Sequence, residues 1–570
     1  MKPRSIRRDH VVTLSVLAGV SAATLLPSVL TVQPAPAPTS IKPVAAPTSP
    51  DTDPLWLQQL TAKSEDPAAT YLDVCLSRFD EPRIFGRSGA YPNGEIGMAM
   101  QTTACNVGSE LVTWIAAMDP RHPFILQNLY RISDGRLEQI GVSWAKHSFY
   151  ALDQGLCGVQ DCTGNLDDNA LDLGCSDTYD ARTNADRAWL GPRSEINPFT
   201  AEWDPCGSLF DIGNGSSPDC LRSYYGAGAG PTDHLTKIKD ADLLVPGATF
   251  VAEGRYIVAD DDEPLNNTSY HQLDFTSTGS DWNVGMIDRV FYWPYVMQWG
   301  DMQNFATPRT DGTAIVSVRT VDLGNGSHRY EYAVYNHDIQ RKIQTFSVPV
   351  AEGVTITNIG FNAATDEEDI YDLSPWSHAV SGTGSSRSVS WWTDSQANNP
   401  LANTLRYAST YTFWFEADSA PSQTTLSMDL FESGAFPSLS CPSMGPRGGS
   451  ASALTLSVGE VHKGQGVDIA VSGARPNERV YILYSFSPYP AGSQRGGLGR
   501  TFSPALNLDV DLAFPIVKAA TVRADGSGQA SFRTTVYSDL PPADVAVQAV
   551  VARSGEESLK SNVALRRVLD

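Results

Sequence analysis

The sequence predicts an all-β, mainly antiparallel protein, in which a large β-sandwich or jelly-roll-like region precedes an immunoglobulin-like β-sandwich. The 570 residues are rich in Tyr, Trp, Thr, Ser, Gly and Pro and poor in Lys, which is typical of strands and turns. Short alternating apolar segments are separated by turn residues along most of the chain. Evidence for helices is thin, and 54–63 is the best short candidate.

The N-terminal segment has the order of a secretory signal. Four basic side chains lie within residues 2–8, and an apolar run follows from 11 to 30. Ala35 and Ala37 are then spaced as in a small-residue cleavage site, which predicts a signal peptide over 1–37. The apolar run is also near the length that spans a bilayer, so an uncleaved N-terminal anchor is the alternative.

Two breaks in composition divide the remainder of the chain. Residues 38–54 form a Pro-rich linker, and 441–452 form a second linker rich in Gly, Pro and Ser. We therefore expect a large disulfide-containing β-rich region over 55–440, with one or two subdomains. An immunoglobulin- or fibronectin-like sandwich is expected over 453–570, where about seven short strands occur without Cys.

A tight turn sets the register of the first expected ribbon. Asp134-Gly135 joins a strand over 124–133 to a strand over 136–141, because both turn residues tolerate positive φ. An apolar pair then lies on one face and an opposite-charge pair on the other, as a half-buried ribbon requires. These pairs are Ile132 with Leu137, and Arg131 with Glu138.

A second ribbon is expected over 315–322 and 328–336. Alternation in its second strand places Tyr330, Tyr332 and Val334 on one face. Further strands are expected at 249–259, 342–350, 386–392 and 410–416, and in the C-terminal module at 453–458, 467–472, 478–486, 528–536, 543–552 and 561–569.

The eight cysteines favour disulfides. Their number is even, and export implies an oxidising compartment. Five of them lie between residues 157 and 220, where few apolar side chains are present and crosslinks would replace a core. A zinc site is the rival interpretation, but the pair at 157 and 162 has no matching second pair. The disulfide candidates are Cys75, Cys105, Cys157, Cys162, Cys175, Cys206, Cys220 and Cys441.

The formal net charge of −23 bears on the partners of the protein. An acidic chain is a poor ligand for a nucleic-acid backbone or an anionic membrane. We expect no nucleic-acid partner, and membrane contact only through an uncleaved N-terminal segment. The expected location is secreted or in the cell envelope.

The acidic stretch over 165–186 is a candidate calcium site. Carboxylates on a loop held by cysteines resemble the oxygen ligands that Ca²⁺ prefers. A solvated acidic loop is the alternative. The ligand candidates are Asp167, Asp168, Asp172 and Asp177.

The sequence lacks the Gly-x-Ser-x-Gly, His-Glu-x-x-His and Walker motifs, so two histidines are the remaining candidates for catalysis. His147 lies in an expected strand, and His337 follows another strand and precedes Asp338. An imidazole beside a carboxylate acts as a metal ligand or a general base. A hydrogen-bonded core histidine is the alternative for each residue.

Three tryptophans are candidates for glycan binding. Trp391 and Trp392 are adjacent, so one of them must point outward from a strand. Trp414 alternates away from the other aromatic side chains of its strand. Exposed tryptophans stack on sugar rings, whereas buried ones belong to the core.

Three stretches, at 135–152, 190–199 and 330–338, resemble segments of large uncharacterised exported bacterial proteins in which a β-rich region precedes a sandwich module. The resemblance covers most of the large region and implies export and this architecture, but no activity. The stretches contain the three candidate catalytic residues, His147, Glu195 and His337.

Two functions remain open at this level. The first is a binding or structural protein that recognises a polysaccharide or another cell-surface component. The second is a metal-dependent extracellular enzyme that acts on a polymer through His147 and His337.

Overall fold

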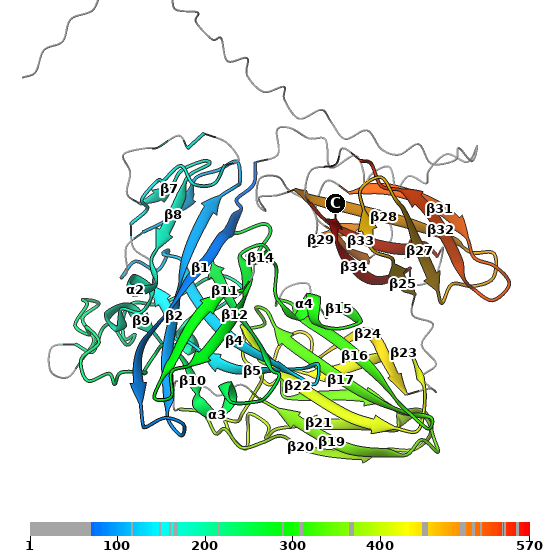
Figure 1. The fold of residues 1–570 in the computed structure, drawn as a ribbon, viewed down its shortest axis with the longest axis horizontal. Coiled ribbons are helices and arrows are strands. Elements are labelled where there is room, and N and C mark those ends of the chain that lie inside the picture. Colours follow the sequence, from blue (N-terminus) through cyan, green and yellow to red (C-terminus); the bar gives the residue numbers. More distant parts are fainter. Residues whose placement is uncertain are drawn as a thin grey trace, which may run out of the picture. The chain divides into compact units, whose positions relative to one another are not determined.

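The computed structural model describes residues 70–569 with internal gaps (Figure 1). The expected signal, the first linker and the helix at 54–63 lie outside the described residues. No helix in the described part is long and apolar enough to cross a membrane. The gaps are 116–117, 148–149, 159–160, 163, 165–168, 214–216, 288–289, 307–311, 364–369, 447–453, 489–497, 504–507, 513–515, 539, 541–542 and 554–557.

The described chain is mainly antiparallel β, which confirms the predicted fold class. A first sheet has the order β1-β2-β10, with β8 also on β2. A second has the order β13-β12-β11-β4-β6-β9, with β14 on β12 and β5 on β4. Their strands are β1 (Val74–Ser88), β2 (Glu95–Asn106), β4 (Phe124–Ser133), β5 (Arg136–Val142), β6 (Ala145–His147), β8 (Ser176–Tyr179), β9 (Leu190–Gly191), β10 (Thr236–Lys239), β11 (Thr249–Ile257), β12 (Thr268–Ser277), β13 (Trp282–Met286) and β14 (Phe291–Tyr292).

The predicted first ribbon is confirmed residue by residue. Strands β4 and β5 pair around the Asp134-Gly135 turn, in which both residues have positive φ. Ile132 lies opposite Leu137, whose side chain is fully buried. The opposite-charge pair also forms, because the Arg131 guanidinium donates to the Glu138 carboxylate. Local turn chemistry and alternation therefore suffice to place this ribbon.

Two further sheets face each other across a shared apolar core. The first has the order β19-β22-β17-β16-β15 and continues, beyond β15, into strand β34 (Leu559–Leu569) of the C-terminal part. The second has the order β20-β21-β18-β23-β24. Tyr330, Tyr332 and Val334 of β17 are all buried in this core, as alternation predicts. The strands are β15 (Met302–Ala306), β16 (Ala314–Gly324), β17 (Ser327–Asn336), β18 (Thr345–Pro349), β19 (Ile356–Asn362), β20 (Ser377–Ser381), β21 (Ser388–Trp392), β22 (Ser409–Ala417), β23 (Pro421–Asp429) and β24 (Ser438–Pro446).

The C-terminal part is a β-sandwich, and all six strands predicted there are present. Strands β25, β27 and β32 form one layer, and β34, β33, β28 and β31 are neighbours in the other. Leu456, Ile469 and Val547 contribute to the core of these strands. The strands are β25 (Thr455–Val458), β26 (Val461–His462), β27 (Gly466–Ser472), β28 (Arg479–Pro488), β29 (Leu498–Ser503), β30 (Leu508–Leu512), β31 (Val517–Arg523), β32 (Ala530–Thr535), β33 (Ala543–Val551) and β34 (Leu559–Leu569).

The second predicted linker begins inside a strand. Strand β24 continues to Pro446 and pairs along its length with β23, so 441–446 belong to the sheet. The division into domains at this point otherwise stays a prediction. The remaining short elements are β3 (Val112–Thr113), β7 (Ala170–Leu171), α2 (Ala181–Asn184), α3 (Asp240–Leu243), α4 (Val296–Trp299), and the 3-10 turns 187–189, 193–195 and 384–386.

Candidate functional site

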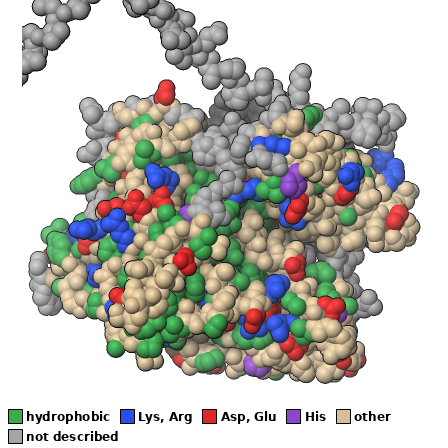
Figure 2. Space-filling view, viewed as in Figure 1, with side chains coloured by type: hydrophobic (Ala, Val, Ile, Leu, Met, Phe, Trp, Pro, Cys, Tyr) green, Lys and Arg blue, Asp and Glu red, His purple; other side chains and the backbone are tan. Residues whose placement is uncertain are grey.

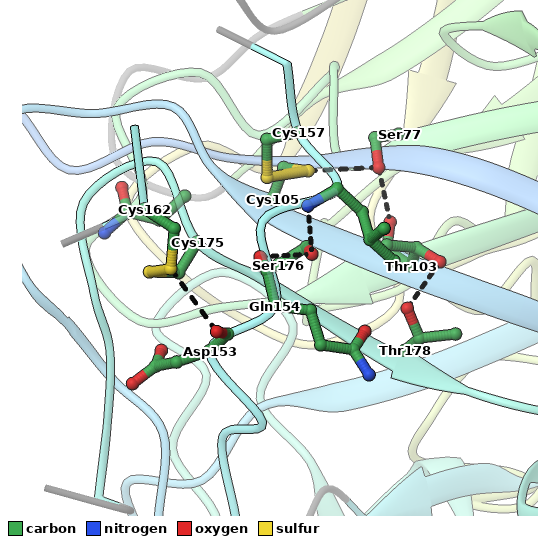
Figure 3. The surroundings of a disulfide bond; sticks show 12 residues. Ser77, Thr103, Cys105, Asp153, Gln154, Cys157, Cys162, Cys175, Ser176 and Thr178 are labelled. Carbon is green, nitrogen blue, oxygen red and sulfur yellow. Dashed lines mark hydrogen bonds between the residues drawn. A yellow bond between two sulfur atoms is a disulfide. The ribbon is translucent and has the colours of Figure 1, made fainter. Parts of the chain in front are cut away.

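Three disulfides hold the Cys-rich segment, as its composition predicts, and the cysteines of two of them are labelled in Figure 3. They join Cys105 to Cys157, Cys162 to Cys175, and Cys206 to Cys220. Such bonds persist in oxidising compartments, so they indicate an extracytoplasmic location.

The prediction is wrong for the other two cysteines, which are buried thiols in this structure. Cys441 lies opposite Leu426 in the apolar core, and burial raises the pKa of its thiol to about 12. Cys75 lies opposite Cys105 on the neighbouring strand, but the sulfur of Cys105 is bonded to Cys157. The even number of cysteines therefore overestimates the number of disulfides.

His147 belongs to a buried histidine pair that the sequence did not reveal. His122, two residues before β4, places its Nε2 2.7 Å from His147 Nδ1. Since His122 Nδ1 lies 2.7 Å from the Asp119 carbonyl and must donate to it, His122 Nε2 accepts a hydrogen bond from the His147 Nδ1–H. Burial lowers the pKa of His122 to about 3 and that of His147 well below its usual value, so both rings are neutral.

Trp203 separates the histidine pair from an open cleft. Its ring centroid lies 4.9 Å from that of His122 and 4.8 Å from that of His147, in edge-on contacts. Only 3% of Trp203 is exposed. Trp203 is one of the residues that line the cleft, and its indole packs against both imidazoles within the core.

The cleft has a volume of about 720 Å³, and we call it the Glu195 cleft. Glu195 closes the 3-10 turn at 193–195 and is held at two points. Its Oε1 accepts from the Leu209 N–H at 2.8 Å, and its Oε2 accepts from the Trp203 indole N–H at 3.3 Å. The other polar side chains in the lining come from both sides of the cleft: Arg121, Asn197, Thr200, Glu202, Asp204 and Gln340.

The rim of the cleft is braced by the Cys206–Cys220 disulfide. The carboxylate of Asp211 lies inside this disulfide loop and accepts from the N–H groups of Gly207 and Cys220, at 3.0 and 2.8 Å. These backbone bonds lower the pKa of Asp211. A crosslink and a buried carboxylate thus hold together the described parts of this loop.

His337 lies in different surroundings from His147. Its ring contacts that of Tyr335 edge-on at 5.7 Å, and its carbonyl accepts from the Arg255 guanidinium. Burial and the Arg255 charge lower the pKa of His337 well below its usual value. Each histidine is therefore buried among its own neighbours, and both ring nitrogens of His337 are buried without a hydrogen-bond partner among the described residues.

The calcium candidates are only partly described. Asp167 and Asp168 lie outside the described residues, whereas Asp172 and Asp177 are buried. Asp177 Oδ2 accepts from the Trp114 indole at 2.7 Å, and burial raises the pKa of this carboxyl to about 6. Within the described ranges, no group of three or more His, Cys, Asp or Glu side chains is arranged to hold a metal.

The tryptophan candidates divide as strand alternation requires. Trp391 is fully buried, whereas 40% of Trp392 is exposed. Trp414 is half-buried, and its ring is covered. The Arg136 guanidinium lies 3.8 Å from its centroid, and Gly360 packs so closely that an added Cβ would lie 2.2 Å from the indole.

Trp414→Ala is therefore expected to act on stability rather than on glycan binding. Loss of the packing and of the Arg136 contact should lower the free energy of unfolding by about 2–3 kcal/mol. Trp392→Ala is the matched control, because its exposed ring should cost less than about 0.5 kcal/mol. Urea unfolding of both variants measures the difference, and equal stabilities would contradict the placement of Trp414.

Comparisons with known proteins assign no family. No protein-family model matches the chain, and no curated protein is similar to it in sequence. Solved structures show only distant resemblance to bacterial alpha-2-macroglobulin, adhesin and pilin β-domains. The alpha-2-macroglobulin of Escherichia coli, activated by porcine elastase, is 10% identical over 87% of this chain and 35% of that chain, with a TM-score of 0.16.

Two further structures have the same level of similarity. A tetra-tandem repeat of a large adhesion protein is 11% identical over 88% of this chain and 99% of that chain, with a TM-score of 0.14. The Corynebacterium diphtheriae major pilin SpaA is 10% identical over 60% of this chain and 86% of that chain, with a TM-score of 0.17. The chain spans about a third of the macroglobulin. At these TM-scores the resemblance carries no argument about function.

Proposed function

We propose that this extracytoplasmic protein binds a glycan in the Glu195 cleft. The observation that carries the proposal is the cleft itself, which has about 720 Å³ of space and seven polar side chains in its lining. Ligand sites are typically concave and fix their ligands with a small number of placed polar groups. The cleft thus supports the proposed recognition of a polysaccharide or surface component.

The chemistry of the lining suits sugar hydroxyls. A hydroxyl both donates and accepts, so it pairs with carboxylates that accept, with guanidinium groups that donate, and with amides that do both. All three kinds line the cleft, in Glu202, Arg121 and Asn197. An apolar ligand would leave these groups without water or partners, which is unfavourable.

The cleft is also held in place before any ligand binds. Glu195 is fixed by two hydrogen bonds, and the rim is crosslinked at Cys206. A preorganised site loses less conformational entropy on binding, and this supports a binding role for a loop-built surface.

The alternative enzyme is less well supported. His147 and His337 are both buried, and burial lowers the pKa of each imidazole. A general base must reach the proton that it removes, and these rings are packed among core aromatics instead. We therefore favour binding over hydrolysis of the polymer.

Removing polar groups from the cleft should weaken glycan binding. Asn197→Ala and Glu202→Ala are each expected to lower affinity about tenfold, because each removes a hydrogen-bonding partner worth about 1–2 kcal/mol. A panel of bacterial surface polysaccharides, screened by retention and followed by calorimetry, identifies the ligand and measures the loss.

Trp392→Ala is the control for this experiment, since Trp392 is exposed on strand β21 and is not part of the cleft lining. If Trp392→Ala alone abolished retention, the sheet face rather than the cleft would be the binding surface. If no polysaccharide were retained by the intact protein, the proposed function would be wrong.

A further inference from the structure

The Glu195 cleft is acidic. Among the described residues of its lining, three carry a carboxylate, Glu195, Glu202 and Asp204, and one, Arg121, carries a positive charge. The space of about 720 Å³ exists independently of these charges. The concave shape therefore indicates a ligand, and the charge of the lining restricts which ligand is accepted.

The positive charge of Arg121 already has a counter-ion. Its Nε and Nη2 donate to the two carboxylate oxygens of Asp119, both at 2.9 Å. These hydrogen bonds lower the pKa of the Asp119 carboxyl, so the pair is ionised at neutral pH. Asp119 is not part of the cleft lining. A ligand in the cleft therefore meets little net positive charge at Arg121.

Two of the carboxylates point to the same side of one short segment. Trp203 forms an antiparallel bridge with Ile196 and is buried, whereas Glu202 and Asp204 on either side of it are exposed. Successive side chains of an extended segment point to opposite sides, so these two share the side away from the indole. Their backbone positions are roughly 7 Å apart, and one group of a ligand can reach both.

Glu202 and Asp204 make no ion pair with any described residue. Asp204 Oδ1 accepts from the Cys206 N–H at 2.9 Å, and this neutral donor leaves the charge of the carboxylate in place. Two like charges at such a separation repel each other, and a cation placed between them is attracted to both. The segment therefore favours a positively charged group of the ligand.

The loop before Glu202 fixes the backbone that carries this carboxylate. The Asn197 N–H donates to the Glu202 carbonyl at 2.9 Å, and the Glu202 N–H donates to Thr200 Oγ1 at 3.3 Å. Asn197 Oδ1 in turn accepts from the N–H groups of Phe199 and Thr200, at 3.0 and 3.3 Å. A cation therefore binds to a charge whose position is set in advance, which reduces the entropy lost on binding.

The neutral part of the lining favours a sugar over a basic peptide as the carrier of the cation. Asn197, Thr200 and Gln340 supply both donors and acceptors. The ammonium of a lysine side chain only donates, so it pairs with the carboxylates and leaves the amide donors without partners. An amino sugar carries hydroxyl groups beside its ammonium, so it matches the charged and the neutral groups together.

We infer that the Glu195 cleft binds an amino sugar with a free ammonium group, such as the de-N-acetylated glucosamine unit of a polysaccharide. The ammonium lies between Glu202 and Asp204, and the hydroxyl groups of the sugar face the neutral polar side chains. This inference rests on the proposed function, because it concerns the same cleft, and it adds the charge of the ligand to that function.

Calorimetry on the intact protein tests the inference with two matched trisaccharides, of glucosamine and of N-acetylglucosamine. Short probes limit the general attraction of an acidic protein for polycations. At pH 6 and low salt the glucosamine form should bind about fivefold more tightly, since two exposed charge pairs contribute on this scale. The advantage should decrease as salt is raised, and it should disappear at a pH at which the amine is neutral.

Two isosteric variants remove the charges that the inference assigns to the ammonium. Glu202→Gln and Asp204→Asn should each lower the ratio of the two affinities about twofold, and the double variant should bring the ratio to about one. Glu202→Gln decides alone if Asp204→Asn is unstable, because it removes no hydrogen bond among the described residues. Asp394→Asn is the control, since Asp394 is exposed outside the cleft lining and its replacement should leave the ratio unchanged.

The outcomes separate this inference from the proposed function. Equal affinities for the two trisaccharides, or a preference that persists in the double variant, would overturn the inference and leave the glycan cleft intact. Binding of neither trisaccharide, while another glycan is retained through Asn197, would also overturn the inference alone. Trilysine that binds more tightly than the glucosamine form would assign the cleft to a basic peptide and overturn both claims. Failure of the intact protein to bind any glycan would likewise overturn both.

Discussion

Replacing Cys105 and Cys157 together by alanine is expected to lower the free energy of unfolding by about 4 kcal/mol. The bond joins residues 52 apart in sequence, and crosslinks of this span restrict the unfolded chain by roughly that amount. Both cysteines must be replaced, because a thiol left at Cys105 would lie opposite Cys75 on strand β1.

The surroundings of this bond explain why its loss is not compensated. The two bonded cysteines form a small buried cluster with Cys75 and Val107. Ser77 Oγ lies 3.2 Å from Cys105 Sγ and donates to the Thr103 carbonyl at 3.0 Å (Figure 3). The segment before Cys157 is otherwise joined to β2 only indirectly among the described contacts, through the bridge of Gln154 to Ser176 of β8.

Urea unfolding of the oxidised protein measures this effect. Cys441→Ala is the matched control, since Cys441 is a buried thiol outside the three disulfides and should cost only about 1 kcal/mol through the small space that it leaves. A double variant as stable as the wild type, or no more affected than Cys441→Ala, would contradict the assigned role of the bond.

The free energy of unfolding of the wild type is expected to increase as the pH rises above 7. Lys146→Met is expected to abolish this increase. Lys146 is 2% exposed, and burial lowers its pKa from 10.5 to about 7. Between these values the unfolded chain binds a proton that the folded chain does not, so the free energy of unfolding increases with pH. From pH 7 to 9 the increase is on the order of 2 kcal/mol.

The neighbours of Lys146 explain how its amine is accommodated in the core. Its Nζ donates to the His147 carbonyl at 2.7 Å and lies 4.5 Å from the centroid of the Tyr179 ring. The nearby carboxylate of Asp177 favours the charged amine but does not offset desolvation. Methionine has a similar length and carries no charge, so it removes the titration with little change in packing.

Paired unfolding curves of the wild type and the variant at pH 7 and pH 9 isolate this contribution. Lys239→Met serves as the control, because Lys239 is exposed at the end of β10 and its replacement should leave the pH dependence unchanged. A wild type with the same pH dependence as Lys146→Met would show that the amine is not the titrating group.

The charge pattern of the face drawn in Figure 2 is mixed. Basic and acidic side chains lie there in small groups between hydrophobic side chains and other surface. A ligand with dense negative charge would find little general attraction on such a face.

The sequence alone determined the features that arise from local chemistry. The Asp134-Gly135 turn and the alternation around it set the register of β4 and β5. Alternation likewise separated the buried Trp391 from the exposed Trp392. Turn geometry and the two-residue period act over neighbouring residues, so they can be read without knowledge of the remaining chain.

Only the tertiary structure decided which residues meet. The pairing of His122 with His147, the packing of Trp414 between Arg136 and Gly360, and the burial of the cysteine thiols depend on contacts between distant segments. The Glu195 cleft combines side chains from near residues 120, 200, 259 and 340. No local pattern encodes such a meeting, because it follows from how the sheets pack and where their connecting loops end.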